Sequence, residues 1–303
     1  MENLKNISLD FSRDTDVMEE IYKWESRFEE NIREASEAIL SGGRVTTVAL
    51  SGPSCSGKTT TAGKLEALLS AAGRRVVSIS IDDFYLDRDD EADRIHIPDY
   101  ESPDALDLEM FSAFTTAIHA GNAATAPVYD FKKRLRTGRK EYIPQENDIY
   151  IFEGIQAMYP EIYESLGSAH TSRVFINVSS SVTANGVQFE PDEIRLLRRL
   201  LRDFRFRASS AEFTFRLWDG VRDNEERRIL PGGEGAEIKI NSVIPYDVYV
   251  MCRGISEILS MVDLYSPQYP AASFLSKKLE GILPYAIPET DVPGDSLLHE
   301  FIG

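Results

Sequence analysis

Residues 45–60 read Val-Thr-Thr-Val-Ala-Leu-Ser-Gly-Pro-Ser-Cys-Ser-Gly-Lys-Thr-Thr, and this stretch decides the fold. Its first six residues form a short, uncharged segment rich in β-branched side chains, which is typical of a strand buried on both faces. The residues from Gly52 to Thr59 fit the pattern G-x-x-x-x-G-K-[ST], which occurs between a strand and a helix. Residues 64–72 then have a helical pattern. The stretch therefore predicts a strand, a phosphate-binding loop and a helix in succession.

The glycine-rich loop predicts nucleotide binding. Gly52 and Gly57 allow the backbone N–H groups to turn inward around phosphates, and the helix that follows adds the partial positive charge of its N-terminus. Lys58 is expected to reach the β- and γ-phosphates, and Thr59 to place its hydroxyl group on Mg²⁺. ATP and Mg²⁺ are therefore the expected cofactors. The residues expected to bind the nucleotide in this loop are Gly52, Pro53, Ser54, Cys55, Ser56, Gly57, Lys58, Thr59 and Thr60.

Further strands and helices follow the loop. Short β-branched or aromatic segments predict buried strands, and helical stretches lie between them. Alternating strands and helices predict an α/β fold with a mainly parallel sheet that helices cover on both faces. The predicted strands are 76–81, 148–152 and 173–178, and the predicted helices lie at 106–119 and after Ile155.

The two ends of the chain have mainly helical patterns. Apolar residues between Val17 and Ile32 recur at spacings of three and four, so the first forty or so residues predict a helix that ends at Ser41, Gly42 and Gly43. We favour a helix that packs on the main domain over one that binds a partner. Further helices are predicted at 213–228, 244–262 and 273–283, with a break at the proline- and glycine-rich residues 231–235.

The composition favours a cytoplasmic protein that acts on a small molecule. The 303 residues include 33 basic and 50 acidic side chains, and a net charge of −17 repels nucleic acid and anionic membranes. Two cysteines make no disulfide framework, and the four histidines show no metal-ligand spacing. The start of the chain lacks the pattern of a secretory signal, and no apolar run reaches the roughly 18 residues of a membrane helix. We expect neither a nucleic-acid nor a membrane partner.

Two of the predicted strands are followed by acidic residues. Asp82 and Asp83 come after the strand 76–81, and Glu153 comes after the strand 148–152. Ligands of doubly wound sheets bind at the carboxyl ends of the strands. Asp82 is therefore the candidate general base toward a hydroxyl acceptor, and Glu153 the candidate acid for Mg²⁺. The alternative for the two aspartates is a plain turn, and the phosphate loop favours the functional interpretation.

A strongly basic segment at about 191–210 has two interpretations. One is a solvated helical face that pairs with acidic neighbours. The other is a lid that closes on the triphosphate, offsets charge on the transferring phosphoryl group and excludes water. We favour the lid. The arginines of the segment are Arg195, Arg198, Arg199, Arg202, Arg205 and Arg207.

Taken together, these residues resemble the uridine kinase and phosphoribulokinase family of P-loop kinases, and within it the bacterial uridine-kinase-like nucleoside kinases. The similarity covers about residues 45–262, in the ordered motifs GPSCSGKTT (52–60), IDDFY (81–85), DYESPDALDLEMF (99–111), PVYDF (127–131), IFEGI (151–155) and RRLLRD (198–203).

The resemblance implies a P-loop NTPase three-layer fold, a mainly parallel sheet with helices on both faces, and an Arg-rich helical lid. The chain then divides into an N-terminal helical extension (1–43), a kinase domain (44–265) and a C-terminal helical extension and tail (266–303). Longer bacterial relatives often carry a TGS domain before the kinase domain, and the short leader here predicts that this domain is absent.

The resemblance also assigns roles to individual residues. Asp82 matches the base that takes the proton from the nucleoside 5′-hydroxyl group, and Glu101 matches the carboxylate that holds the ribose hydroxyls. Arg134 stands where uridine–cytidine kinases place a histidine that reads the pyrimidine edge, and Arg207-Ala208 stands where the lid usually has Arg-Gly. The implied residues are Asp82, Lys58, Arg199 and Arg202 for catalysis, Arg207 for the nucleotide, Thr59 and Glu153 for the metal, and Asp82, Tyr85, Tyr100, Glu101, Tyr129 and Arg134 for the substrate.

The sequence thus predicts ATP-dependent phosphorylation of the 5′-hydroxyl group of a nucleoside, uridine or a relative. One alternative keeps the chemistry and changes the acceptor to a sugar phosphate, pantothenate or glycerate. A phosphorylated acceptor needs further basic residues, and the candidates are Lys132, Lys133, Arg134 and Arg136. A second alternative is a nucleotide-binding regulator without catalysis, which would need no acceptor base. The sequence leaves open whether the protein forms a homo-oligomer.

Overall fold

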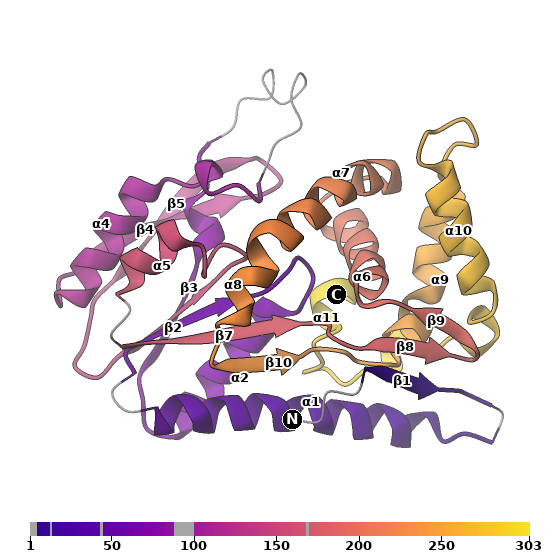
Figure 1. The fold of residues 1–303 in the computed structure, drawn as a ribbon, viewed down its shortest axis with the longest axis horizontal. Helices are drawn as coiled ribbons and strands as arrows, with labels where there is room; N and C mark the ends of the chain where they lie inside the picture. Colours follow the sequence, from indigo (N-terminus) through magenta and orange to yellow (C-terminus); the bar gives the residue numbers. More distant parts are fainter. Residues whose placement is uncertain (1–4, 13, 43–44, 88–99, 168–169) are drawn as a thin grey trace.

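Parallel strands form the central sheet, in the order β10-β7-β2-β6-β3 (Figure 1). The pairings confirm the predicted parallel sheet. The computed structural model describes residues 5–12, 14–42, 45–87, 100–167 and 170–303. The predicted domain boundary at Gly43 and Arg44, and Asp99 of one family motif, lie outside the described residues. The strands are β2 (Thr47–Ser51), β3 (Val76–Ser80), β6 (Ile149–Glu153), β7 (Thr171–Asn177) and β10 (Ile238–Asn241).

Both faces of this sheet are buried. All five residues of β2 are buried, and successive side chains point to opposite faces, so Val48 and Leu50 belong to one hydrophobic cluster and Ala49 to another. The same alternation puts Ile151 and Phe152 of β6 into these two clusters. A parallel sheet with apolar residues on both sides needs a layer of helices over each face.

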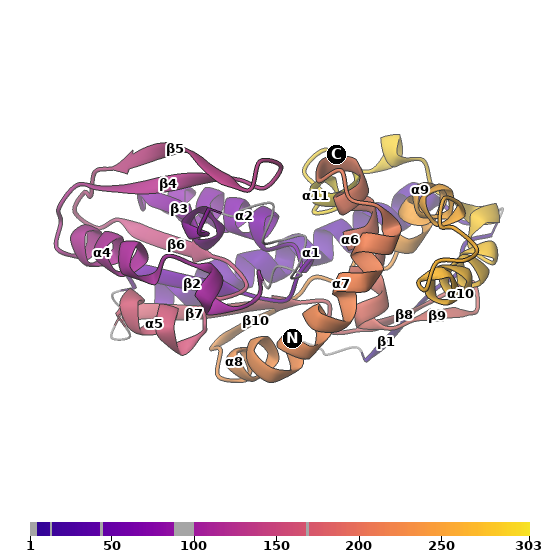
Figure 2. The same cartoon turned by 90° about the horizontal axis from the view of Figure 1, so that it is seen from above.

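Helices α1 and α2 cover one face of the sheet, and α4 and α5 cover the other (Figures 1 and 2). α1 begins after Asp16, whose carboxylate accepts hydrogen bonds from the N–H groups of Met18 and Glu19. On the other face, the ring of Phe111 packs edge-on against Phe152, 5.7 Å between centroids. The helices are α1 (Val17–Ser41), α2 (Lys58–Ala71), α4 (Leu108–His119) and α5 (Pro160–Leu166).

Two smaller sheets lie outside the central one. β4 (Ala124–Asp130) pairs antiparallel with β5 (Leu135–Tyr142), and β4 contacts the short turn of helix at Ile81–Phe84 that follows β3. The other sheet has the order β1-β8-β9, in which β1 is the strand Asn6–Leu9. These strands are not predicted from the sequence, because β5 is exposed at most positions and β8 (Ser181–Ala184) and β9 (Val187–Phe189) are very short.

The described N-terminal residues include a strand before α1. β1 (Asn6–Leu9) pairs in parallel with β8, so the prediction that the first forty or so residues are helical is wrong at these positions. Ile7 and Leu9 are buried while the residues before each of them are exposed, which is the period of two that a strand shows. Over four residues this pattern is too short to be separated from the helical pattern that follows.

From Pro191 onward the chain is mainly helical, with β10 between α8 and α9 (Figure 2). The predicted break at 231–235 is wrong for residues 231–234, because α8 is helical there and continues from a wide helical turn at Glu225–Ile229; the helix ends at Gly235. Pro231 lies in the first turn of α8, where an N–H group would have no intrahelical partner. The helices are α6 (Pro191–Phe206), α7 (Ala211–Asn224), α8 (Leu230–Glu234), α9 (Asp247–Ser260), α10 (Tyr269–Glu280) and α11 (His299–Ile302).

The C-terminal segment returns to the middle of the molecule. In both views α11 and the C-terminus lie beside α6 (Figures 1 and 2). Leu297 and Phe301 are buried in the same hydrophobic cluster as residues of α1 and α2. The predicted N- and C-terminal extensions therefore share a core with the predicted kinase domain. Within the described ranges, no helix is long and apolar enough to cross a membrane.

Asn185 joins the N-terminal segment to the rest of the molecule. Its side chain bonds to the N–H and the carbonyl group of Phe11, at 3.0 and 2.9 Å, and accepts a hydrogen bond of 2.5 Å from the Tyr249 hydroxyl. Its φ of 43° lies in the left-handed region that disfavours most side chains.

We expect Asn185→Ala to lower the free energy of unfolding by about 2–4 kcal/mol, because it removes these hydrogen bonds and leaves an alanine at positive φ. Asn185→Gly removes the same bonds without backbone strain, so its loss should be smaller by about 1 kcal/mol. Urea unfolding of the three proteins measures both effects. Equal losses of unfolding free energy in the two variants would show that backbone strain at residue 185 makes no contribution.

Candidate active site

The carboxyl ends of β2, β6 and β3 meet at one cavity. The phosphate loop follows β2, Asp82 follows β3, and Glu153 is the last residue of β6. The cavity has a volume of about 360 Å³. It is lined by the predicted nucleotide and metal residues Ser54, Cys55, Lys58, Thr59 and Glu153, by the predicted substrate residues Asp82, Tyr85, Tyr100, Glu101 and Arg134, and by Arg199, Arg202 and Arg207.

The phosphate loop has the backbone that a cradle for an anion requires. Cys55 (φ 60°) and Gly57 (φ 89°) lie in the left-handed region, and residues in this conformation turn successive N–H groups toward one side. A Cβ atom at Gly52 would lie 2.0 Å from the carbonyl oxygen of Ile176, so only glycine fits there. Gly52 is therefore required because the Ile176 carbonyl group lies so close to it, and Gly57 because its φ is positive.

Polar groups of the loop are placed to receive an anion. Lys58 Nζ donates to the carbonyl oxygens of Gly52 and Pro53, at 3.1 and 2.9 Å. Ser56 Oγ is buried without a hydrogen-bond partner in the described part of the chain. The lysine is thus folded back on the loop, and a bound phosphate would replace the two carbonyl groups as its partner.

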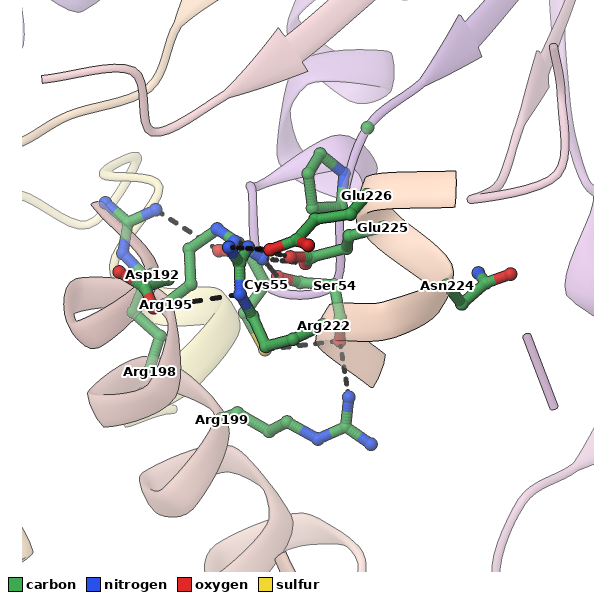
Figure 3. A network of polar contacts seen from close by, with 12 residues as sticks. Ser54, Cys55, Asp192, Arg195, Arg198, Arg199, Arg222, Asn224, Glu225 and Glu226 are labelled. Carbon is green, nitrogen blue, oxygen red and sulfur yellow. Dashed lines mark hydrogen bonds and ion pairs between the residues drawn. The ribbon is translucent and has the colours of Figure 1, made fainter. Parts of the chain in front are cut away.

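Arginines of α6 bind the phosphate loop (Figure 3). Arg195 donates to the carbonyl oxygen of Ser54 at 3.3 Å, and Arg199 donates to the hydroxyl oxygen of Ser54 at 3.1 Å. Arg198 donates to the carbonyl oxygen of Cys55 at 3.3 Å. Buried carbonyl groups need donors, and a loop that turns its N–H groups toward a ligand has its carbonyl groups facing the protein. These arginines supply the donors.

Two of these arginines form buried ion pairs. Arg195 is 2% exposed and pairs with Glu225, Nη2 to Oε2 2.9 Å, and Arg198 is 0% exposed and pairs with Asp247, Nε to Oδ2 2.7 Å. Arg195 and Arg198 therefore lie neither on a solvated helical face nor in a lid over the triphosphate, the two interpretations of the basic segment. The sequence shows the arginines, but it does not show that two carboxylates from the turn after α7 and from the start of α9 meet them in the interior.

The remaining arginines lie around one carboxylate. Arg199, Arg202 and Arg207 approach Asp203 at 3.3, 2.9 and 3.9 Å. Burial alone would raise the pKa of Asp203, but the three guanidinium groups lower it below its usual value. Ala208 has a φ of 52°, in the left-handed region, at the position where the family resemblance places glycine. Arg199, Arg202 and Arg207 therefore line the cavity and are at the same time paired with Asp203.

Three carboxyl groups of the cavity have raised pKa values. Burial raises the pKa of Glu153 to about 7, and the nearby Asp82 adds to this. Burial also raises the pKa of Glu101 to about 7, against the opposing effect of Arg199. The pKa of Asp82 is raised by burial as well, although Lys58 lowers it. Burial is the largest cause of all three shifts, so these carboxyl groups keep their protons to a higher pH than exposed acids do.

Aromatic residues form another wall of the cavity. The ring of Tyr85 lies 5.5 Å from that of Tyr100 and 5.9 Å from that of Phe131. The Tyr85 hydroxyl donates to the Tyr100 carbonyl oxygen at 2.8 Å and accepts from Gln156 Nε2 at 3.1 Å. Tyr129 does not line the cavity, because its side chain points from β4 into the core behind Tyr85 and Phe131. Phe131, just beyond the end of β4, lies where Tyr129 was expected.

Other residues join the site without a signal in the sequence. Glu300 of α11 lines the cavity, and Asn224 at the end of α7 donates to Glu101 Oε2 at 3.4 Å. Both lie far along the chain from the residues that they meet, and no motif marks them. Phe131 does have a signal in the sequence, because it is the last residue of the motif PVYDF.

A second cavity, of about 610 Å³, lies between α1 and β10. Trp24, Arg27 and Lys239 are among its lining residues, and it contains none of the residues that the sequence assigns to catalysis or binding. We therefore place the candidate active site in the smaller cavity, where the phosphate loop and the acidic strand ends meet.

Residues 47–248 match the family described as Phosphoribulokinase / Uridine kinase family. The chain belongs to this family. It is 26% identical over 195 residues to the uridine kinase of Ureaplasma urealyticum, which covers 64% of this chain and 86% of that protein. It is 28% identical over 163 residues to uridine-cytidine kinase C of Dictyostelium discoideum, over 54% of this chain and only 31% of that protein.

Among solved structures, a possible uridine kinase from Bacillus stearothermophilus aligns with a TM-score of 0.48 and 18% identity, over 71% of this chain and 99% of that one. Because this similarity is low, the family assignment rests on the sequence match. Membership makes the chain a phosphotransferase that acts on a hydroxyl group of a small substrate.

The residues of the cavity fit the nucleotide that the family implies. The N–H and hydroxyl groups of Thr60, in the first turn of α2, already hold a carboxylate, that of Glu300. Thr59 and Glu153 line the same cavity, but the described residues contain no group of three or more His, Cys, Asp or Glu side chains that could hold a metal ion. Mg²⁺ would therefore need oxygen atoms of the nucleotide as further ligands.

The buried pair of Arg198 and Asp247 leads to a stability prediction. Burial raises the pKa of Asp247 to about 7 even though Arg198 lowers it. Arg198→Met removes the partner and leaves a buried acid, so we expect a loss of about 3–5 kcal/mol in the free energy of unfolding at pH 8. At pH 6 the loss should be smaller, because the isolated Asp247 binds a proton there.

The double variant Arg198→Met/Asp247→Asn should recover part of this loss, and urea unfolding of the single and double variants measures it. Arg205→Met is the control on the same helix, because Arg205 pairs with Glu289 at a partly exposed site. Equal losses in the single and the double variant would contradict the ion pair as the cause.

The raised pKa of Glu101 leads to a second prediction. Its pKa rises from 4.5 in the unfolded chain to about 7 in the folded protein, so between these values the folded protein binds more protons. The contribution of Glu101 to stability is therefore present below pH 4.5 and is lost as the pH rises toward 7. We expect Glu101→Gln to reduce the fall in unfolding free energy between pH 5 and pH 8 by about 1–2 kcal/mol.

Urea unfolding at several pH values measures this change. Asp104→Asn is a matched control, because it removes an exposed acid in the same segment. A pH dependence that stays the same in Glu101→Gln would show that Glu101 is ionised in the folded protein throughout this range.

Proposed function

We propose that this protein transfers the γ-phosphoryl group of ATP to the 5′-hydroxyl group of a nucleoside, uridine or a relative. The observation that carries the proposal is that Asp82 borders the same cavity as Lys58, together with Glu101 and an aromatic wall. A kinase for a small alcohol needs these parts in one place: a phosphate cradle, a base for the hydroxyl proton and a surface for the acceptor.

On the nucleotide side, the chain binds and orients phosphate groups. Lys58 exchanges the carbonyl groups of the loop for phosphate oxygens, and Arg199, Arg202 and Arg207 add positive charge beside the cavity. When Mg²⁺ is bound it neutralises charge on the β- and γ-phosphates. Thr59 and Glu153 are the residues that would hold it, with the oxygen atoms of the nucleotide.

On the acceptor side, the chain positions a hydroxyl group. Asp82 accepts its proton as the bond to phosphorus forms, and a base with a raised pKa suits this task near neutral pH. Glu101 would accept hydrogen bonds from the ribose hydroxyls, and Asn224 keeps it in place. Tyr100 and Phe131 offer apolar faces for a base.

A second acceptor class has support from one observation. Of the basic residues that a phosphorylated acceptor would need, Lys132 and Arg134 line the cavity. Lys133 and Arg136 are not among the lining residues, and they pair with Asp130 at 3.5 Å and with Asp107 at 3.1 Å. Two cations near the acceptor wall favour a sugar phosphate or another acidic alcohol such as glycerate or pantothenate, with the same phosphoryl transfer.

Asp82→Asn tests the base. We expect kcat to fall about 10²–10⁴-fold, the usual contribution of general-base catalysis, with little change in the dissociation constant of Mg-ATP. Asp83→Asn is the control, because Asp83 accepts a hydrogen bond from the Tyr129 N–H group at 3.0 Å and an asparagine oxygen preserves this contact. Full activity in Asp82→Asn would refute the assignment.

The acceptor is identified by ADP release with Mg-ATP across ribo- and deoxynucleosides, sugar phosphates, glycerate and pantothenate. Turnover that depends on a nucleoside would support the proposal, and the preferred base would show what Arg134 recognises. Turnover with a phosphorylated or acidic alcohol alone would favour the second class and exclude the ribose role of Glu101. ATP binding without turnover on any acceptor would favour the regulator that the sequence leaves as an alternative.

A further inference from the structure

The C-terminal segment places a carboxylate on the nucleotide side of the cavity. Glu300 accepts hydrogen bonds from the backbone N–H of Thr60 at 3.4 Å and from its hydroxyl group at 3.2 Å. Thr60 lies in the first turn of α2, directly after the phosphate loop. In phosphate-binding loops, the N–H groups of this region hold the α- and β-phosphates. Glu300 thus occupies donors that a nucleotide phosphate would use.

The segment that carries Glu300 is firmly held. A Cβ atom at Gly57 would lie 2.1 Å from Leu297, so this side chain packs directly on the loop backbone. Phe301 is fully buried with its ring 5.2 Å from the guanidinium group of Arg198, and Arg205 donates to the carbonyl oxygen of Ile302 at 2.5 Å. Residues on both sides of Glu300 are therefore anchored, and rotation of its side chain alone would release Thr60.

The contact between Glu300 and Thr60 lies among the acids of the cavity and outside the part of the chain that matches the family. Glu300 is near the other acids of the cavity, since burial, Asp82 and Glu300 all raise the pKa of Glu153. It also lies beyond residue 248, where the match to the family ends. The contact is therefore a property of this chain that the family match does not describe.

We propose that Glu300 is a residue of the nucleotide site that holds the Thr60 donors in the free enzyme and is displaced when a nucleotide phosphate binds them. The inference rests on the proposed function, because it requires that the loop binds a nucleotide. A carboxylate and a phosphate cannot share the same donors, since both are anions and both need the same N–H and hydroxyl groups. Glu300 therefore weakens nucleotide binding, and it does so for ATP and ADP alike.

The test is the dissociation constant of Mg-ADP, measured by isothermal titration calorimetry, in the wild-type protein and in Glu300→Gln. The variant has the same size but no charge, so we expect about three- to tenfold tighter binding. Glu300→Ala should bind at least as tightly, because it releases Thr60 completely. Glu289→Gln is the matched control, since it removes the same charge from the same segment, where Glu289 pairs with Arg205.

Each outcome has a separate meaning. Binding that is unchanged or weaker in Glu300→Gln, in a variant with a wild-type circular dichroism spectrum, would overturn the displacement, and weaker binding would make Glu300 a ligand of the Mg-nucleotide. An equal gain in Glu289→Gln would overturn it as well, because the effect would then come from net charge. Failure of all the proteins to bind Mg-ADP and Mg-ATP would refute the proposed function and with it the displacement, whereas loss of the Glu300 effect alone leaves the kinase assignment intact.

Discussion

A loop that presents its N–H groups to a phosphate must satisfy its carbonyl groups elsewhere, and in this protein that constraint shapes the interior. Arg195 and Arg198 reach from α6 to the carbonyl groups of the loop. Such charges are stable in the interior only with well-placed partners, and these are Glu225 and Asp247. The conformation of the loop thus depends on carboxylates from distant parts of the chain. Arg195 and Arg198, the largest fully buried side chains of the protein as described, thus hold the backbone of the phosphate loop.

The turn after α7 connects the two sides of the cavity. Glu225 pairs with Arg195, which holds the phosphate loop, and the preceding residue, Asn224, donates to Glu101 on the acceptor wall. The wide helical turn at Glu225–Ile229 begins at this point, and such turns are frequent at functional sites. A displacement of this turn would move the nucleotide side and the acceptor side together. This turn is therefore one structural link between the nucleotide side and the acceptor side of the cavity.

Local patterns account for what the sequence predicts well. The strand, loop and helix at 45–72 and the parallel sheet follow from residue types and short spacings. So do Lys58, Asp82 and Glu153, which lie at or beyond the carboxyl ends of strands of that sheet. The residues that sequence reasoning misses depend on contacts across the fold. Glu300 and Asn224 have no local signal, and the sequence alone assigns Arg195 and Arg198 to a lid or a solvated face because it does not show their buried partners. The strands β1, β8 and β9 are too short for their alternation to be recognised.

The packing of Leu297 and Phe301 beside the phosphate loop also affects how the protein is made. Thr60 and Glu300 are 240 residues apart, so at about 5–20 residues per second the ribosome completes the loop roughly 10–50 s before the residues that pack behind it. During that interval the loop and α2 lack Leu297, and Arg198 lacks the ring of Phe301. The nascent chain can form its sheet while it is still being synthesised. The nucleotide site is completed only after Leu297 and Phe301 have been synthesised and have packed behind the loop.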